Sequence, residues 1–281
     1  MSNLKVHNLF SVKGRVLVIT GGESGIGAMF TKALGANEAA KVYMVGHHFD
    51  KLQEVANTAQ NKLIVPIQGD ITWKDPPAAI ASQIEKETGF INCIIANSGA
   101  TDHDLYGVPQ KPQPTFSELH KYLWGTPISD FNHAFMANTT ACFYTLLTFL
   151  PLLDAGNKSE MGRRLGVKSQ FIATSSIGAF SRRPGMEFAY TTSTVGVIHL
   201  VKQFCPGFHQ SDIGHGLMGR KDLMRESPVS PEMIPLTRAG TEEDAGGDLL
   251  FLCCHGNILI SDGVRMLIVP ATYYDPSRGR E

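Results

Sequence analysis

The stretch Thr-Gly-Gly-Glu-Ser-Gly-Ile-Gly at residues 20–27 decides the fold. It follows an unbroken apolar run at residues 16–19, which is typical of a strand buried on both faces. After it, apolar residues recur at helical spacing, at Ile26, Met29, Phe30, Ala33 and Leu34. The glycines therefore lie at a strand-to-helix turn, where the helix N-terminus presents free amides and the positive end of its dipole to an anion.

Three of the four glycines of this turn have a clear physical role. Gly21 can adopt the tight turn, Gly25 lets the backbone approach a pyrophosphate, and Gly27 allows close packing of helix and strand. A glycine pattern alone is weak evidence, and a purely structural turn is the alternative. Flanked by this strand and this helix, the pattern predicts a dinucleotide site.

Composition excludes several classes of protein. Only 18% of the 281 residues are charged and the net charge is −1, which argues against a nucleic-acid or polyanion partner. The five cysteines show no CxxC spacing and are expected to be reduced, buried thiols. The N-terminus lacks the apolar core of a signal peptide, and the apolar run 143–153 is too short to span a bilayer and contains Pro151. We expect a soluble, cytoplasmic protein with no membrane partner.

Further strands and helices alternate after the first unit. Strands are predicted at residues 41–45, 63–67, 90–96 and 171–174, with a helical face after the first and, after the second, a helix at 78–86 begun by Pro76 and Pro77. This rhythm predicts an α/β fold of the Rossmann type, a doubly wound parallel sheet with right-handed crossovers. Neither a repeat nor a linker is evident, so residues 1–281 are expected to form one domain.

The other segments are less regular. Residues 101–128 contain four prolines and are predicted to form a long surface loop. A long helix is expected at about 129–153, with Ser129 or Asp130 as N-cap, and a loop at 156–168. A capping box predicts a helix from 241 to about 253, and 257–260 a last strand.

Several motifs occur in a recognisable order: residues 20–27, Asn-Ser-Gly-Ala at 97–100, Thr-Ser-Ser-Ile-Gly at 174–178, Tyr-Thr-Thr-Ser at 190–193 and Pro-Gly at 206–207. Over essentially its whole length the chain resembles the short-chain dehydrogenase/reductase family. The resemblance implies that the cofactor contacts are Thr20, Gly21, Ser24, Gly25, Ile26, Gly27, Asp70, Asn97, Gly99, Thr194, Pro206, Gly207 and Ser211. It also implies that the catalytic residues are Ser175, Tyr190 and Asn138.

The chemistry explains these residue types. Carbonyl reduction needs a hydride and a proton, and a phenol such as Tyr190 can donate that proton if its pKa is lowered from about 10. A hydroxyl can hold the same oxygen, and Ser175 is preferred for this role over Ser176 because it precedes Gly178 by three residues, as in the family. Asn138 would organise a water or proton path by resemblance. The alternatives are ordinary strand-end serines, a half-buried tyrosine, and an asparagine bonded within its helix.

Two features depart from the family. Thr194 stands where the family has a lysine that binds the nicotinamide ribose and lowers the tyrosine pKa by its charge. Lys202 is about 12 Å further along the helix and cannot replace it, and Arg182 or Arg183 are more simply solvated loop residues. In addition, about a dozen residues that would form the helix end and the sixth strand are absent before Pro206. The tyrosine helix is therefore expected to be shortened.

The cofactor cannot be assigned uniquely from the sequence. An acid at the end of the second strand would select NAD, but Gly46, His47 and His48 stand there. His47 or His48 could meet a 2′-phosphate, whereas Glu23 would repel one. The balance favours NADP(H) slightly over NAD(H). No metal site is expected, because adjacent histidines do not converge on one ion.

The chain is thus expected to be an NAD(P)(H)-dependent oxidoreductase that interconverts a carbonyl and a secondary alcohol on a small, fairly apolar molecule. The substrate would lie beneath loops at about 101–128 and 208–240, which carry apolar residues such as Tyr106, Phe116, Tyr122, Trp124, Leu217, Met218 and Met224. The alternative is a nucleotide-binding pseudoenzyme or non-redox relative. By resemblance, a homodimer would form through residues 129–153.

Overall fold

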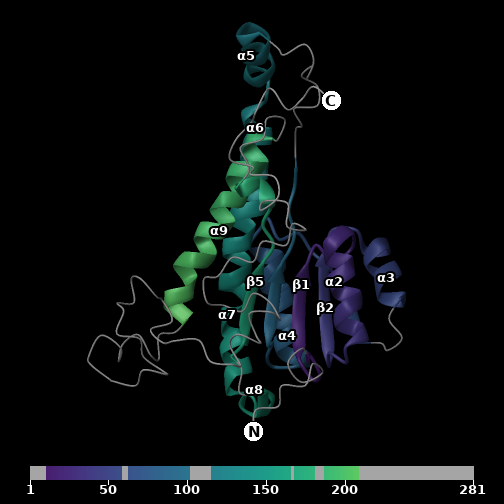
Figure 1. The fold of residues 1–281 in the computed structure, drawn as a ribbon. Helices are drawn as coiled ribbons and strands as arrows, with labels where there is room; N and C mark the ends of the chain where they lie inside the picture. The colour runs from purple at the N-terminus through teal and green to yellow at the C-terminus, as the bar shows by residue number, and fades with distance from the viewer. Residues whose placement is uncertain (1–10, 59–62, 102–114, 166–167, 181–186, 209–281) are drawn as a thin grey trace, which may run out of the picture.

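A parallel sheet organises the computed structural model, which describes residues 11–58, 63–101, 115–165, 168–180 and 187–208. Within these residues the sheet has five strands in the order β3-β2-β1-β4-β5, which agrees with the predicted Rossmann-type fold (Figure 1). All four neighbouring pairs are parallel. The strands are β1 (Val16–Thr20), β2 (Lys41–Gly46), β3 (Ile64–Gln68), β4 (Cys93–Ala96) and β5 (Gln170–Ala173).

Both faces of the sheet are covered because β1 is apolar on both sides. Leu17 and Ile19 pack in one cluster with residues of α2 (Gly25–Ala36) and α3 (Phe49–Asn57). Val18 packs in a second cluster with α4 (Asp75–Glu87) and α7 (Ala141–Lys158). The carboxyl ends of the central strands therefore meet at one edge, beside the N-terminus of α2.

The predicted long helix is present and longer than expected. It runs through α6 (Ile128–Phe135), the π-helical turn η2 (Met136–Thr140) and α7. Its N-cap is Pro127, without a side-chain bond, so the prediction of Ser129 or Asp130 was wrong. Within the described residues, 128–158 is the one helix long and apolar enough to cross a membrane, but half of the relevant window is buried. Its buried residues pack on the sheet, as in a core helix.

Two predicted loops contain helices. The segment 101–128 includes α5 (Phe116–Trp124), whose Thr115–Glu118 capping box fixes its first turn. Residues 156–168 include the end of α7 and α8 (Glu160–Leu165). The loop predictions were wrong because proline and glycine punctuate a chain without showing how many residues between them can form a helix.

The tyrosine helix is not shortened. It is α9 (Phe188–Phe208), and it includes Pro206 and Gly207 in its last turn. The two residues expected to touch the cofactor therefore lie in a helix. The predicted helix at 241–253, the strand at 257–260 and most of the loop 208–240 lie outside the described residues. One domain for the whole chain stays a prediction.

A polar cluster links β2 to α4 at the sheet edge opposite the glycine turn. Lys41 Nζ lies 2.8 Å from Glu87 Oε2, and the hydroxyl of buried Tyr43 donates to the same oxygen over 3.0 Å. The Lys41 hydrogen bond, followed by one from Gln83, lowers the pKa of Glu87 to about 2. A carboxyl group with a lowered folded-state pKa stabilises the fold above its unfolded pKa, and the effect is lost as pH falls.

We predict that Glu87→Gln destabilises the protein at neutral pH but much less in acid. The difference in unfolding free energy between the two proteins should shrink as pH falls from about 5 toward about 2, because wild-type Glu87 then becomes protonated in the folded state too. Urea unfolding across this range measures it. Exposed Glu160→Gln is the matched control, and an equal difference at every pH would contradict the assignment.

Candidate active site

The glycine turn leaves Ser24, Gly25 and Ile26 exposed at the start of α2. Gly21 and Gly25 have φ of +66° and +51°, in the left-handed region that favours glycine. A Cβ at Gly27 would overlap the carbonyl oxygen of Gly21 and lie 2.6 Å from Asn97 Nδ2, whereas one at Gly25 would meet nothing within 4 Å. Ser24, the N-cap of α2, makes no side-chain cap bond. Gly27 is thus needed for packing, and Gly25 faces open space that a phosphate could approach.

The turn is tied to the ends of β4 and β5. Thr20 Oγ1 accepts hydrogen bonds from the amides of Asn97 and Ser98 at 3.1 and 3.2 Å. Asn97 Nδ2 donates to the carbonyl of Gly21 at 3.3 Å, and Thr174 Oγ1 donates to Asn97 Oδ1 at 3.1 Å. Three strand ends are therefore held together at the predicted site.

Asn138 connects the β4 end to α9. It is buried in η2, where its Oδ1 accepts from the Ala100 amide at 2.8 Å. Its Nδ2 donates to the Ala100 carbonyl at 3.1 Å and to Ser193 Oγ at 2.9 Å. The alternative of an asparagine bonded within its own helix does not describe these contacts, because the partners lie on other segments. Its side chain acts as a positioning group, and a role in a proton path stays a prediction.

The π-helical turn fits α9 closely. Thr139 Oγ1 donates to the carbonyl of Ser193 over 2.7 Å, and a Cβ at Gly196 would lie 2.9 Å from Thr139 Oγ1. Such turns widen a helix locally and are frequent at functional sites. Here the turn meets the part of α9 that carries Tyr190 and Thr194. Sequence reasoning gave no role to Thr139 and Ser193, whose hydroxyls mark no motif by themselves.

The two serines differ in their hydrogen bonds. Ser175 Oγ donates to the carbonyl of Thr194 at 2.9 Å, whereas Ser176 Oγ accepts from the Gly178 amide at 3.0 Å. A hydroxyl has a single proton to donate. The Ser175 hydroxyl proton is thus bonded to α9, whereas no described residue accepts the Ser176 hydroxyl proton.

The position of the family's lysine is buried. Thr194 is 4% exposed, and its Oγ1 donates to the Thr191 carbonyl at 2.8 Å within α9. Tyr190 lies one turn earlier and is half-buried. Lys202 is exposed two turns further on, so the continuous helix keeps its charge distant. Arg182 and Arg183 lie outside the described residues.

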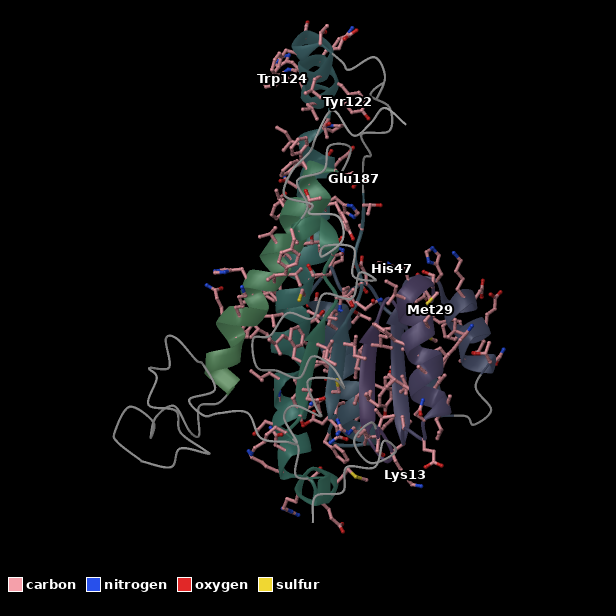
Figure 2. The ribbon with its side chains drawn as sticks, viewed as in Figure 1. Lys13, Met29, His47, Tyr122, Trp124 and Glu187 are labelled. Carbon is pink, nitrogen blue, oxygen red and sulfur yellow. The ribbon has the colours of Figure 1, made fainter. Side chains whose placement is uncertain are left out.

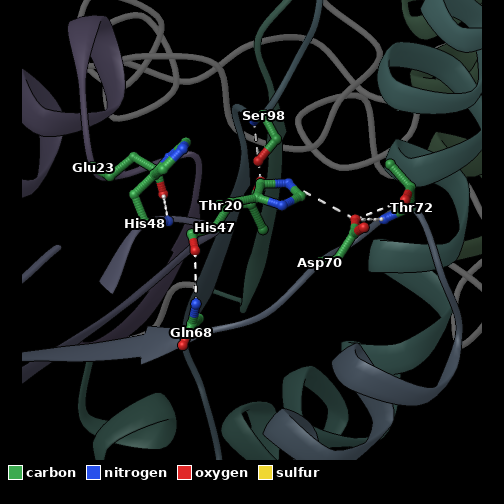
Figure 3. Close-up of polar contacts among 8 residues, drawn as sticks. All are labelled: Thr20, Glu23, His47, His48, Gln68, Asp70, Thr72 and Ser98. Carbon is green, nitrogen blue, oxygen red and sulfur yellow. Dashed lines mark hydrogen bonds and ion pairs between the residues drawn. The ribbon is translucent and has the colours of Figure 1, made fainter. Parts of the chain in front are cut away.

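Charged and imidazole groups gather at the ends of β2 and β3 (Figure 3). His47 Nε2 lies 3.8 Å from Asp70 Oδ1, and Glu23 Oε1 lies 2.7 Å from His48 Nδ1. Burial raises the pKa of Asp70, but hydrogen bonds from the Thr72 hydroxyl and amide outweigh it, and the pKa is lowered. Asp70, a predicted cofactor contact, and His47, which was expected to be able to meet a 2′-phosphate, are thus neighbours.

Some predicted residues do not reach this site. Pro206 and Gly207 lie about 18 Å from Thr194 along the axis of α9, given the rise of a helix, so their expected cofactor contact is not supported. Ser211 lies outside the described residues. Phe116 and Trp124 are 93% and 81% exposed on α5. Figure 2 shows Trp124 and Tyr122 on α5, far from His47.

Comparison with known proteins agrees with this arrangement. Residues 15–214 match the family described as short chain dehydrogenase. The short-chain dehydrogenase/reductase PhomF of Diaporthe leptostromiformis is 37% identical over 287 residues, covering 95% of this chain and 96% of PhomF. The hydroxynaphthalene reductase arp2 of Aspergillus fumigatus is 26% identical over 263 residues, covering 86% of each chain.

A solved structure shows the same fold. The NADPH-dependent 3-quinuclidinone reductase from Rhodotorula rubra aligns with a TM-score of 0.54 at 24% identity, covering 74% of this chain and 70% of that chain. At this identity the likeness concerns the fold alone. Together with the family match, the glycine turn and the tied strand ends place the protein: it belongs to the short-chain dehydrogenase/reductase family of oxidoreductases, which act on CH–OH groups or carbonyls.

Proposed function

We propose that this chain is an NAD(P)(H)-dependent oxidoreductase interconverting a carbonyl and a secondary alcohol on a small, fairly apolar metabolite. One observation carries the proposal: Gly25, where an added Cβ would meet nothing within 4 Å, lies on a turn that is bonded, through Asn97 and Thr174, to the strand end bearing both serines. A phosphate-binding turn and a set of hydroxyl groups thereby share one edge of the sheet.

The residues divide the work as follows. The nicotinamide cofactor, when bound at the glycine turn, supplies the hydride. Tyr190 donates the proton to the developing alkoxide, or accepts it in the reverse direction. A serine hydroxyl holds the substrate oxygen. We assign this hydrogen bond first to Ser176, whose proton is free, although the sequence pattern favours Ser175, whose proton is bonded to the Thr194 carbonyl.

Thr194 favours a second candidate function. A buried threonine bonded within its own helix brings no positive charge to Tyr190. The chain would then be a nucleotide-binding pseudoenzyme or a non-redox relative with impaired hydride transfer. Purified protein that binds NADH or NADPH but oxidises neither with a panel of aromatic and alicyclic ketones would favour this candidate.

We predict that Tyr190→Phe lowers kcat for ketone reduction by roughly 100-fold or more, the usual loss of a general acid. Ser176→Ala should cost about 100-fold as well, because it removes a donor to the reacting oxygen. Ser175→Ala should cost less than about tenfold. Steady-state kinetics measures the three losses in kcat, and the cofactor Kd of each variant should be unchanged. If Ser175→Ala lowered kcat more than Ser176→Ala, the hydrogen bond to the substrate oxygen would be assigned to Ser175.

We predict that Thr194→Lys raises kcat for alcohol oxidation by about tenfold and moves its pH profile toward lower pH. A nearby positive charge favours the phenolate and so lowers the pH at which a tyrosine acts as a base. Thr194→Met is the matched control, since it adds length without charge. A folded lysine variant with no gain over the methionine variant would reject the missing charge as the limitation.

We propose a homodimer through residues 129–153, where Phe131, Met136 and Leu147 are 39%, 44% and 40% exposed. Burying such side chains is the main driving force of association. Light scattering on purified protein should give the mass of two chains, and Leu147→Glu should give one. Trp124→Glu on α5 is the control. A monomeric wild-type protein would rule the dimer out.

A further inference from the structure

A carboxylate from another segment lies at the end of β2, where the strand's own sequence has no acidic residue. Gly46 is followed by His47 and His48, yet Glu23 from the glycine turn folds across this strand end (Figure 3). Its Oε1 lies 2.7 Å from His48 Nδ1, and its Oε2 accepts from the His48 amide at 3.3 Å. The Glu23 side chain is only 12% exposed, so the carboxylate is fixed and not freely solvated.

Gly46 makes this arrangement possible. A Cβ at this position would overlap Glu23 Oε2. The missing side chain therefore leaves the space in which the carboxylate lies. Gly46 at the end of β2 and Glu23 in the turn therefore fit together, although 23 positions separate them in the sequence.

Dinucleotide folds place an acid at the end of the second strand, about 20 residues after the glycine motif, to hydrogen-bond the 2′-hydroxyl of the adenosine ribose. Resting on the proposed function above, we infer that Glu23 takes over this task and makes the protein select NAD(H) over NADP(H). His48 is its positioning residue. A 2′-phosphate would bring at least one more negative charge against a fixed carboxylate, which is strongly unfavourable in a partly buried place.

The surroundings give a 2′-phosphate little compensation. The next charged group is Asp70, which is paired with His47 at 3.8 Å. His48 uses Nδ1 for Glu23, and the His47 carbonyl accepts from Gln68 Nε2 at 2.9 Å. Among described residues, the polar contacts at these strand ends involve no arginine or lysine. Each of the two histidines, which from the sequence favoured NADP(H), thus has a carboxylate as its neighbour.

The test is the ratio of two dissociation constants. NADH and NADPH are titrated into wild-type protein at constant ionic strength, following cofactor fluorescence. We expect NADH to bind at least about tenfold more tightly. Glu23→Gln keeps the size and a hydrogen-bonding amide but removes the charge, so it should tighten NADPH by about tenfold and bring the ratio toward one. His48→Gln should also bring the ratio of the two dissociation constants toward one, but to a smaller extent.

Glu38→Gln is the matched control, because it removes one carboxylate that pairs with Lys13, away from the glycine turn. It should leave the ratio unchanged. If Glu23→Gln changed both constants equally, or changed the melting temperature and left the ratio as in the wild type, Glu23 would be merely structural, and this result would overturn the inference. So would wild-type preference for NADPH, a measurement that needs no variant. Failure to bind either cofactor would refute the proposed function itself and this inference with it.

Discussion

The contact between the first turn of α2 and the end of β1 is the constraint on which the site depends. Gly27 lies against the carbonyl of Gly21 and the side chain of Asn97 so closely that no other residue fits. This contact aims the N-terminus of α2 past the strand ends, where its free amides and dipole favour an anion. The same Asn97 bonds Thr174 on the next strand. Packing, phosphate recognition and placement of the hydroxyl groups therefore share one set of interactions.

The proton-transfer half of the site is built differently from the phosphate half. Its geometry is held by buried hydrogen bonds from Asn138 and Thr139 to α9 and the β4 end, which are costly to leave unmade. Among the described residues, the position of the family's lysine carries no charge, because Thr194 is buried and bonded within the helix. We therefore expect this position to affect the proposed proton transfer more than cofactor binding.

Helices were predicted correctly where the apolar spacing extends over many residues, and they were missed where prolines and glycines interrupt the sequence. The helix 128–158 and the strand-turn-helix at 16–36 follow their apolar spacing. In contrast, α5 and α8 lie in segments whose prolines and glycines indicated loops, and α9 continues through Pro206 and Gly207. The stripe at Ile26, Met29 and Phe30 is helical as predicted but 53%, 67% and 37% exposed, because Gly27, Ala28 and Thr31 make the inward face. Periodicity indicates a helix; it does not decide which face is buried.

The sequence by itself determined the doubly wound sheet, the glycine turn and the family, because these depend on local periodicity and on backbone conformations that only glycine adopts readily. Tertiary structure decided which side chains meet. Asn138 pairs with Ser193 across 55 positions, and Glu23 with His48 across 25. Both contacts depend on strand register and helix packing, which no local pattern encodes. Glu23, which the sequence analysis expected only to repel a phosphate, thus lies at the end of β2 as its acidic group.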